Sequence, residues 1–335
     1  MKFGAVPVAE ATGATLAHSV RAAGRRMRKG AVLTAQDILA LQGEGLSEVI
    51  VARLDAGDLD ENAAAARLAE ALVPDPAAAH LDRTEAFTGR VNLLARGPGV
   101  TRLDVAAIEA ANRVDPMITV ATVPPWQQVG PGQMVATIKI ISYAVPAAAL
   151  ERACEIARGA LSLCPPRLAT AELIVTQIPG GPPDDKGIAS VRARVEALAM
   201  ALSDVRLVPH RRTPLAEALR DSHADLVLVL TASATSDPDD VAPGALRDAG
   251  GRVDRFGMPV DPGNLLFLGA LGARPVIGLP GCARTPALNG ADWVLSRVAC
   301  GVPVTPDDIA AMGVGGLLKE IPTRPHPRRT RARDD

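Results

Sequence analysis

The chain has 335 residues, of which 48% are apolar, 22% are charged and 2% are aromatic, and its formal net charge at pH 7 is −1. This length is enough for two domains, and the composition excludes a highly charged, disordered chain. The near-zero net charge excludes overall electrostatic attraction to nucleic acid or acidic membranes. The scarcity of aromatic residues excludes the stacking platforms that bind single-stranded nucleic acid. We therefore expect a globular protein that binds neither nucleic acid nor membrane.

The sequence predicts a cytoplasmic protein. No apolar run approaches the roughly 20 residues that a membrane-spanning helix needs, and the first 20 residues lack a long apolar centre. The four cysteines, Cys154, Cys164, Cys282 and Cys300, have no Cys-x-x-Cys spacing and are too few for a disulfide scaffold. We expect them to be reduced and mostly buried.

The first part of the chain predicts a small mixed domain. Thr34 is a typical N-cap with an acidic residue three positions later, so we expect a helix over residues 34–41. The β-branched residues 48–54 predict a strand, and the acidic start and alanine-rich body of residues 60–72 predict a second helix. The looser segment 73–79 follows and suggests a linker.

The next part is richer in β-branched residues. Residues 119–123 and 135–141 predict two strands that pair across a long loop of Pro-Pro and Gly-Pro-Gly turns. Residues 147–163 predict a helix, and Pro165-Pro166 predicts a domain boundary. This part of the chain is therefore expected to combine strands and helices.

From residue 166 onward, predicted strands and helices alternate. The apolar runs predict strands over residues 173–178, 205–208, 226–230 and 275–279. Helices are expected around residues 191–202, from Thr213-Pro214 to Arg220, before Gly250-Gly251, and over residues 289–298. Such alternation is typical of a mostly parallel sheet with helices on both sides.

We therefore predict an α/β protein whose C-terminal domain is a three-layer αβα structure with a mostly parallel sheet. The expected divisions are a mixed α+β region over residues 1–165, with a candidate split into 1–78 and 79–165, an α/β domain over 166–322, and a disordered tail over 323–335. In such sheets, ligands bind at loops beyond the carboxyl ends of the strands. These loops are expected at residues 176–186, 231–240 and 280–289.

The loop over residues 231–240 follows the most apolar strand and is rich in side-chain oxygens. Its hydroxyls are on Thr231, Ser233, Thr235 and Ser236, and its carboxylates are on Asp237, Asp239 and Asp240. Hydroxyls and backbone N–H groups can hold a phosphate, and a nearby carboxylate can hold the Mg²⁺ that accompanies it. The alternative is a helix N-cap with solvated acids.

Two further segments combine turn residues with polar side chains. GMPVDPGNLLFLG, residues 257–269, is a rigid turn whose candidate ligand-binding residues are Asp261, Gly263 and Asn264. GLPGCARTPALNG, residues 278–290, places Pro280 and Gly281 before a helix, as in anion sites, and Arg284 could neutralise an anion. Each segment could instead be a simple connection.

In this order and spacing, the three segments resemble the molybdopterin-binding domain shared by molybdopterin adenylyltransferase, molybdopterin molybdotransferase and gephyrin. The resemblance covers about residues 171–301 and rests on VLVLTASATSDPDDVAPGALRDAGG, MPVDPGNLLFLG and GLPGCAR. Segments such as LAHSVR, GRVNLLA and MGVGGLLKE resemble a divergent bacterial branch of molybdopterin-binding proteins. The resemblance implies molybdopterin as ligand, with Mg²⁺ and either molybdate or an ATP or AMP moiety.

The chain departs from the family at several positions. Thr231 and Ala232 stand where the family has two glycines, and Asp261 and Asn264 stand where it has two lysines. The resemblance assigns the metal to Asp239 or Asp240, with Asp237 nearby. It implies a pterin-phosphate pocket supported by Ser233, Asp240, Lys186 and Arg284.

Three functions are compatible with this resemblance. The first is molybdopterin binding in molybdenum cofactor biosynthesis, with Mg²⁺-dependent molybdate insertion by Asp240 and Asp239 as the leading catalytic hypothesis. The second is a non-catalytic pterin carrier or sensor, which the missing lysines favour, and the third is adenylyl transfer. The resemblance also implies a homo-oligomer that works with other proteins of cofactor synthesis.

A few other polar residues stand out. The five histidines have no metal-ligand spacing, but His210 ends a predicted strand and merits a test. In the N-terminal half, Arg90, Asn92, Asn112 and Lys139 lie in apolar surroundings and could line a cleft, although ordinary surface placement is the alternative.

Overall fold

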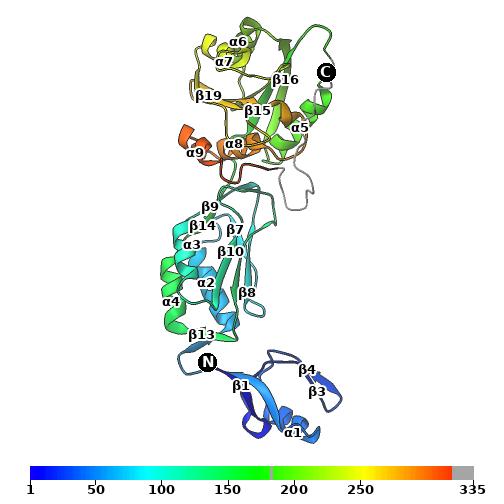
Figure 1. The fold of residues 1–335 in the computed structure, drawn as a ribbon, viewed down its shortest axis with the longest axis vertical. Coiled ribbons are helices and arrows are strands. Elements are labelled where there is room, and N and C mark those ends of the chain that lie inside the picture. The colour runs from blue at the N-terminus through cyan, green and yellow to red at the C-terminus, as the bar shows by residue number, and fades with distance from the viewer. Residues whose placement is uncertain (182–183, 319–335) are drawn as a thin grey trace, which may run out of the picture. The chain divides into compact units, whose positions relative to one another are not determined.

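The computed structural model describes residues 1–181 and 184–318 and divides the chain into two compact units (Figure 1). Unit 1 comprises residues 1–97, 101–125 and 131–163, and unit 2 comprises residues 98–100, 126–130 and those from Cys164 on. The tail predicted over residues 323–335 lies outside the described residues. In the described ranges, no helix is long and apolar enough to cross a membrane.

The first part of unit 1 is built on a small antiparallel sheet. Strand β5 (Glu48–Arg53) pairs with β1 (Lys2–Pro7) on one side and with β2 (Thr15–Leu16) on the other. Helix α1 (Ala35–Gly43) begins after Thr34, which forms the expected capping box with Asp37. The remaining elements are η1 (Val8–Glu10), β3 (Val20–Ala22) and β4 (Arg25–Met27). The helix and strand predicted here are confirmed.

The second part of unit 1 contains a four-stranded antiparallel sheet in the order β10-β12-β8-β7. Helix α2 packs on β12 and β8, and α4 packs on α2. In chain order, the elements from residue 58 to residue 164 are β6 (Asp58–Asp60), α2 (Glu61–Leu72), β7 (Leu81–Arg83), β8 (Arg90–Ala95), β9 (Gly99–Leu103), α3 (Val105–Asn112), β10 (Ile118–Thr122), β11 (Gln128–Val129), β12 (Met134–Ile140), β13 (Ala144–Pro146), α4 (Ala147–Ile156) and β14 (Leu161–Cys164). Of these, β11 and the start of β9 belong to unit 2. The predicted pairing of the strands near residues 119–123 and 135–141 is therefore confirmed.

The helix predicted over residues 147–163 is too long. Helix α4 ends at Ile156, and the chain enters β14 at Leu161. Gly159 lies between them with a φ of +67°, a conformation that suits glycine and ends a helix. The apolar residues beyond it, which read as a continued helix, belong to a strand.

Unit 2 contains a six-stranded sheet in the order β16-β15-β17-β20-β19-β18. The first four strands are parallel to one another. Strand β19 runs antiparallel to β20, and β18 runs antiparallel to β19 and therefore in the direction of the first four. Their bounds are β15 (Thr170–Gln177), β16 (Ala201–Pro209), β17 (Leu226–Leu230), β18 (Arg252–Phe256), β19 (Phe267–Leu271) and β20 (Arg274–Leu279). The expectation of a mixed α/β chain is confirmed.

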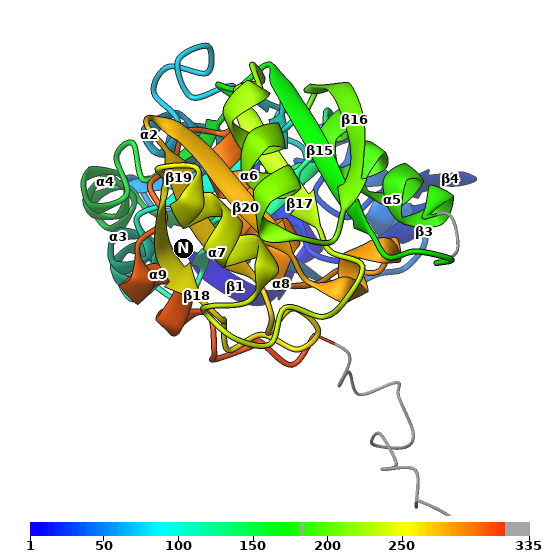
Figure 2. The same cartoon turned by 90° about the horizontal axis from the view of Figure 1, so that it is seen from above.

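Helices pack on both faces of this sheet. Leu228 contributes to a core with α5 (Asp185–Glu196) and α8 (Gly290–Ala299), whereas Val229 contributes to a core with α6 (Arg212–Asp221) and α7 (Val241–Asp248). In Figure 1, α6 and α7 lie above the strands and α5 and α8 lie below, and in Figure 2 α6 and α7 lie in front. All five residues of β17 are buried, as expected for a central strand that is covered on both faces.

Helix α6 begins earlier than its sequence predicts. Thr213 was the expected N-cap with Pro214 as the first helical residue, but the N-cap is Arg211, whose backbone is extended. Its side chain makes no capping hydrogen bond. Two short elements complete unit 2: η2 (Gly281–Arg284) and α9 (Pro306–Ala311).

Candidate functional site

The sheet of unit 2 has a switch point between β15 and β17. From β15 the chain runs through α5 to β16 on one side, and then through α6 to β17 on the other side of β15. The cores assign α5 and α6 to opposite faces of the sheet. The loops that leave β15 and β17 therefore diverge, and such points are where open α/β sheets bind ligands.

A pocket of about 250 Å³ lies at this point. Its lining comes from the end of β15 and the following loop, from the loop after β17, and from η2 after β20: Val175, Thr176, Gln177, Ile178, Gly181, Asp184, Ala232 and Arg284. Its volume is just below the roughly 300–1,000 Å³ of most small-molecule pockets. It would hold one end of a metabolite and leave the rest outside.

Thr176 joins three elements on the β15 side of the pocket. Its hydroxyl oxygen accepts a hydrogen bond from the Ala232 backbone N–H at 2.9 Å and lies 2.8 Å from His210 Nδ1. The side chain of Thr176 is buried, and the backbone N–H of His210 donates to the Gln177 carbonyl at 2.8 Å. Thr176 thus fixes the start of the β17 loop against the ends of β15 and β16.

Arg284 lines the pocket from the end of η2. Its Nε donates to the Asp184 carboxylate at 2.8 Å, and its Nη2 donates to the Thr231 carbonyl at 2.8 Å. The side chains of Arg284 and Asp184 are 30% and 18% exposed, so the ion pair is only partly screened by water. Through these two contacts, Arg284 joins the segments that follow β15, β17 and β20. The carboxylate of Asp184 balances the positive charge of Arg284.

The hydroxyls of the 231–240 loop mostly hold the loop itself. The Thr231 hydroxyl donates to the Ser233 carbonyl at 2.6 Å and lies 3.2 Å from that of Thr235, and both threonines are buried. The Ser236 hydroxyl donates to the Ala234 carbonyl at 3.3 Å. Ser233 is exposed. Of the four predicted hydroxyls, that of Ser233 is the one most open to a ligand.

The carboxylates of this loop have partners within the protein. Asp240 is the N-cap of α7, and its carboxylate accepts from the backbone N–H groups of Val241 at 2.6 Å and Ser236 at 3.0 Å. Asp239 pairs with Arg247, and Asp237 accepts from the Asp239 N–H at 2.7 Å. Among the residues that the structure describes, no group of three or more His, Cys, Asp or Glu side chains could hold a metal ion. The N-cap interpretation of Asp240 is confirmed, and a metal site here stays a prediction.

The turn that contains Asp261, Gly263 and Asn264 connects β18 to β19. It lies at the same end of the sheet as the carboxyl end of β20, because Phe267 at the start of β19 pairs with both Phe256 and Gly278. None of the three lines the pocket. A Cβ on Gly263, whose φ is +142°, would lie 2.7 Å from the Gly290 nitrogen, so this glycine permits close packing on α8. Asn264 donates to the Met258 carbonyl at 3.3 Å.

The remaining predicted site residues lie near the pocket. Pro280 and Gly281 begin η2, which carries Arg284, and a Cβ on Gly281 would lie 3.9 Å from the Arg284 Nη1 atom. Lys186 is exposed in the first turn of α5, two residues after Asp184. Of the eight lining residues, sequence reasoning proposed only Arg284 as a ligand-binding residue and missed the other seven, Asp184 and Ala232 among them. A signal existed for Asp184, since it lies in a loop expected beyond a strand end.

The four polar candidates of unit 1 are structural. The side chain of Asn112 donates to the Val120 carbonyl at 2.9 Å and accepts from the Val120 N–H at 2.8 Å. Asn92 accepts from the Thr137 hydroxyl at 2.9 Å. Arg90 donates to the Thr137 hydroxyl at 3.0 Å, and Lys139 donates to the Thr88 carbonyl at 2.5 Å. They join strands β8, β10 and β12 to one another, to a turn and to the end of α3.

Comparison with known proteins gives distant likenesses. A domain family of unknown function, DUF8806, matches residues 5–53, and no curated protein matches the chain. The chain is similar to a molybdopterin biosynthesis MoeA protein from Pyrococcus horikoshii, with 11% identity and a TM-score of 0.30, over 92% of this chain and 75% of that one. It is also similar to the molybdopterin biosynthesis enzyme MoaB from Thermus thermophilus, with 16% identity and a TM-score of 0.28, over 44% of this chain and 98% of that one. Both TM-scores are below 0.5, so both likenesses are distant.

Proposed function

We propose that unit 2 binds a phosphorylated pterin of the molybdopterin type in the pocket at the switch point. The observation that carries this proposal is the lining of the pocket. It combines the segments after β15, β17 and β20, and the last two are segments on which the sequence resemblance to molybdopterin-binding domains rests. A three-layer αβα arrangement of this unit, as in that family, is part of the proposal.

The chemistry of the lining suits a pterin ring. The pyrimidine edge of a pterin offers amino, N–H and carbonyl groups, so it needs both hydrogen-bond donors and acceptors. Asp184 provides acceptors, Arg284 provides donors, and Gln177 provides both. Because Arg284 and Asp184 neutralise each other, the pocket favours an uncharged polar ring over a free anion.

The phosphate of the ligand would lie outside the pocket, near the exposed hydroxyl of Ser233 and the exposed ammonium of Lys186. These two groups flank the pocket on the β17 and α5 sides. An exposed lysine attracts a phosphate as a point charge, without the geometric demands of a guanidinium. The pterin ring would then lie in the electrically balanced pocket, and the phosphate would lie outside it beside a positive charge.

We propose binding ahead of catalysis because the acids of the 231–240 loop already have protein partners. Asp240 accepts two backbone N–H groups, and Asp239 is paired with Arg247. Among the described residues, these carboxylates do not form the converging oxygen set that Mg²⁺ prefers. Molybdate insertion and adenylyl transfer therefore rank below a carrier or sensor function. Homo-oligomer formation and contact with other cofactor-synthesis proteins stay predictions.

The test is a titration of the purified protein with molybdopterin, followed by pterin fluorescence. We expect saturable binding that Arg284→Gln weakens about tenfold or more, because the ion pair that shapes the pocket is lost. Arg252→Gln is the matched control, since Arg252 is an exposed arginine on β18 that pairs with Asp254. Equal affinity in all three proteins would contradict the proposed site.

A second arm separates binding from catalysis. The protein is incubated with molybdopterin, MgATP and molybdate, and the products are separated by chromatography. We expect no adenylylated or molybdenum-loaded product. Turnover that disappears in Asp240→Asn would instead establish the catalytic alternative, because this variant retains one oxygen for the N-cap.

A further inference from the structure

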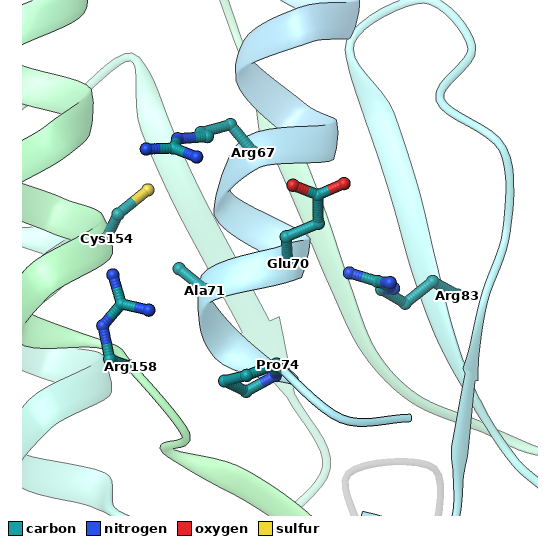
Figure 3. A pocket seen from close by; sticks show the side chains of 7 residues that line it. All are labelled: Arg67, Glu70, Ala71, Pro74, Arg83, Cys154 and Arg158. Carbon is teal, nitrogen blue, oxygen red and sulfur yellow. The ribbon is translucent and has the colours of Figure 1, made fainter. Parts of the chain in front are cut away.

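A second pocket lies in unit 1 and shares no residue with the site described above. Its volume is about 280 Å³, and its lining comes from the last turns of α2, the end of α4 and strand β7: Arg67, Glu70, Ala71, Pro74, Arg83, Cys154 and Arg158. Figure 3 shows the guanidinium groups of Arg83 and Arg158 directed toward the end of α2 from opposite sides. Three arginines thus face one small cavity.

Positive charge exceeds negative charge in this lining. The three guanidinium groups face one lining carboxylate, that of Glu70. Arg67 is held by Glu151, through hydrogen bonds of 3.0 Å from Nε and 3.1 Å from Nη2. Within the described residues, Arg83 and Arg158 have no carboxylate within 4.0 Å. Two cations therefore remain available to an anion.

Arg83 gives an independent indication of a missing partner. Its Nη1 atom is buried and has no hydrogen-bond partner among the described residues. A buried donor without an acceptor destabilises the fold by roughly 1–3 kcal/mol, and more when it is charged. Native proteins satisfy nearly all such groups, so an acceptor from a ligand is the simplest way to complete this one.

The sulfur in the pocket does not oppose an anion. Burial raises the pKa of the Cys154 thiol to about 11, so the group is uncharged at neutral pH. A neutral thiol beside an anion costs little, whereas a thiolate would repel it.

We propose that this pocket binds a small metabolite through a phosphate group, with Arg83 and Arg158 as its ligands and Arg67 at the rim. A guanidinium matches the geometry of phosphate oxygens with two parallel hydrogen bonds. The pocket lies slightly below the roughly 300 Å³ lower limit of common ligand sites, which restricts the ligand to a small molecule. This inference is independent of the function proposed for unit 2.

The test uses inorganic phosphate as the probe and the full chain. Phosphate is titrated at constant ionic strength against chloride, by calorimetry and by ³¹P line width. We expect saturable binding, weakened about tenfold or more in both Arg83→Gln and Arg158→Gln. Arg113→Gln should bind like the original protein, since Arg113 is exposed and pairs with Glu109 in the same part of the chain.

Two outcomes would overturn the proposal: no saturable phosphate binding, or unchanged affinity in both pocket variants. Citrate forms a further arm at the same ionic strength, and tighter binding of citrate than of phosphate would overturn the choice of phosphate. Both variants should keep the far-ultraviolet circular dichroism of the original protein, because neither side chain forms an ion pair with a described residue. Arg158 is also exposed, so Arg158→Gln provides the test even if Arg83→Gln does not fold.

Discussion

The two units each contain an arginine-lined pocket, but they use arginine differently. In unit 2, Arg284 is fixed by Asp184 and by the Thr231 carbonyl, so its charge is balanced within the protein. In unit 1, Arg83 and Arg158 face their pocket without an ion-pair partner among the described residues, and a buried nitrogen of Arg83 has no acceptor there. An arginine that is paired within the protein favours a neutral polar ligand, whereas an unpaired arginine favours an anionic ligand.

The two pockets can be compared as separate sites if the two units unfold independently. Core truncations test this independence and have the largest expected effect. Leu228 in unit 2 and Leu68 in unit 1 are both fully buried. We expect each Leu→Ala variant to lower the unfolding free energy of its own unit by about 2–5 kcal/mol, through lost burial and a residual cavity. Hydrogen–deuterium exchange read by peptide would show faster exchange in that unit only. Equal loss of protection in both units would mean that they unfold together.

Thr176 tests how tightly the unit 2 pocket depends on its internal hydrogen bonds. Thr176→Val keeps the shape of the side chain but leaves the Ala232 N–H and His210 Nδ1 without their partner. We expect a loss of about 1–3 kcal/mol in the unfolding free energy of unit 2, together with weaker pterin binding. Thr176→Ser retains the hydroxyl and is the matched control. Unchanged unfolding curves for Thr176→Val would show that these contacts do not hold the site.

The smallest expected effect is on acid stability, because it concerns an exposed group in unit 2. Hydrogen bonds from the backbone N–H groups of Ala169 and Thr170 and from the Thr170 hydroxyl hold the pKa of Asp225 below its ordinary value of 3.8. A lowered pKa stabilises the folded state above the unfolded pKa, and this contribution is lost as the pH falls through the folded pKa. Asp225→Asn should therefore flatten the loss of unit 2 stability below pH 3.8.

Unit 1 offers the matched measurement. Hydrogen bonds from Thr34 hold the pKa of Asp37 below 3.8, with the same sign. Asp37→Asn should flatten the acid transition of unit 1 and leave that of unit 2 unchanged. Peptide-resolved exchange between about pH 2.5 and 5 would follow both units at once. A variant that altered the wrong unit would contradict the assignment.

Much of the fold could be predicted because its signals are local. The capping box of Thr34 and the uninterrupted apolar run of β17 are each specified within a few residues. The errors also have local causes. Apolar residues continue past Gly159, so the sequence did not show that α4 ends at Ile156. The N-cap of α6 is Arg211, which has an extended backbone and lies two residues before the expected N-cap.

The candidate site could be predicted only to the level of loops. The carboxyl ends of β15, β17 and β20 were expected to carry it, but the sequence does not show which side chains face inward. Thr176 and His210 are 34 residues apart and meet because β16 pairs with β15, an order that the strands themselves do not reveal. Arg67, Arg83 and Arg158 share no motif or spacing, so the unit 1 pocket had no sequence signal.

The interleaving of the two units constrains how they can be made. The chain passes from one unit to the other after residues 97, 100, 125, 130 and 163, so unit 2 is assembled from separated stretches. One of them contains Trp126, whose ring lies 5.5 Å from the guanidinium carbon of Arg297. During synthesis, unit 1 is complete once residue 163 has emerged, whereas Trp126 cannot contact Arg297 until most of the chain has been made. A fragment that begins at residue 164 would lack the two short stretches 98–100 and 126–130, so a single cut at this point removes part of unit 2 from the rest of that unit.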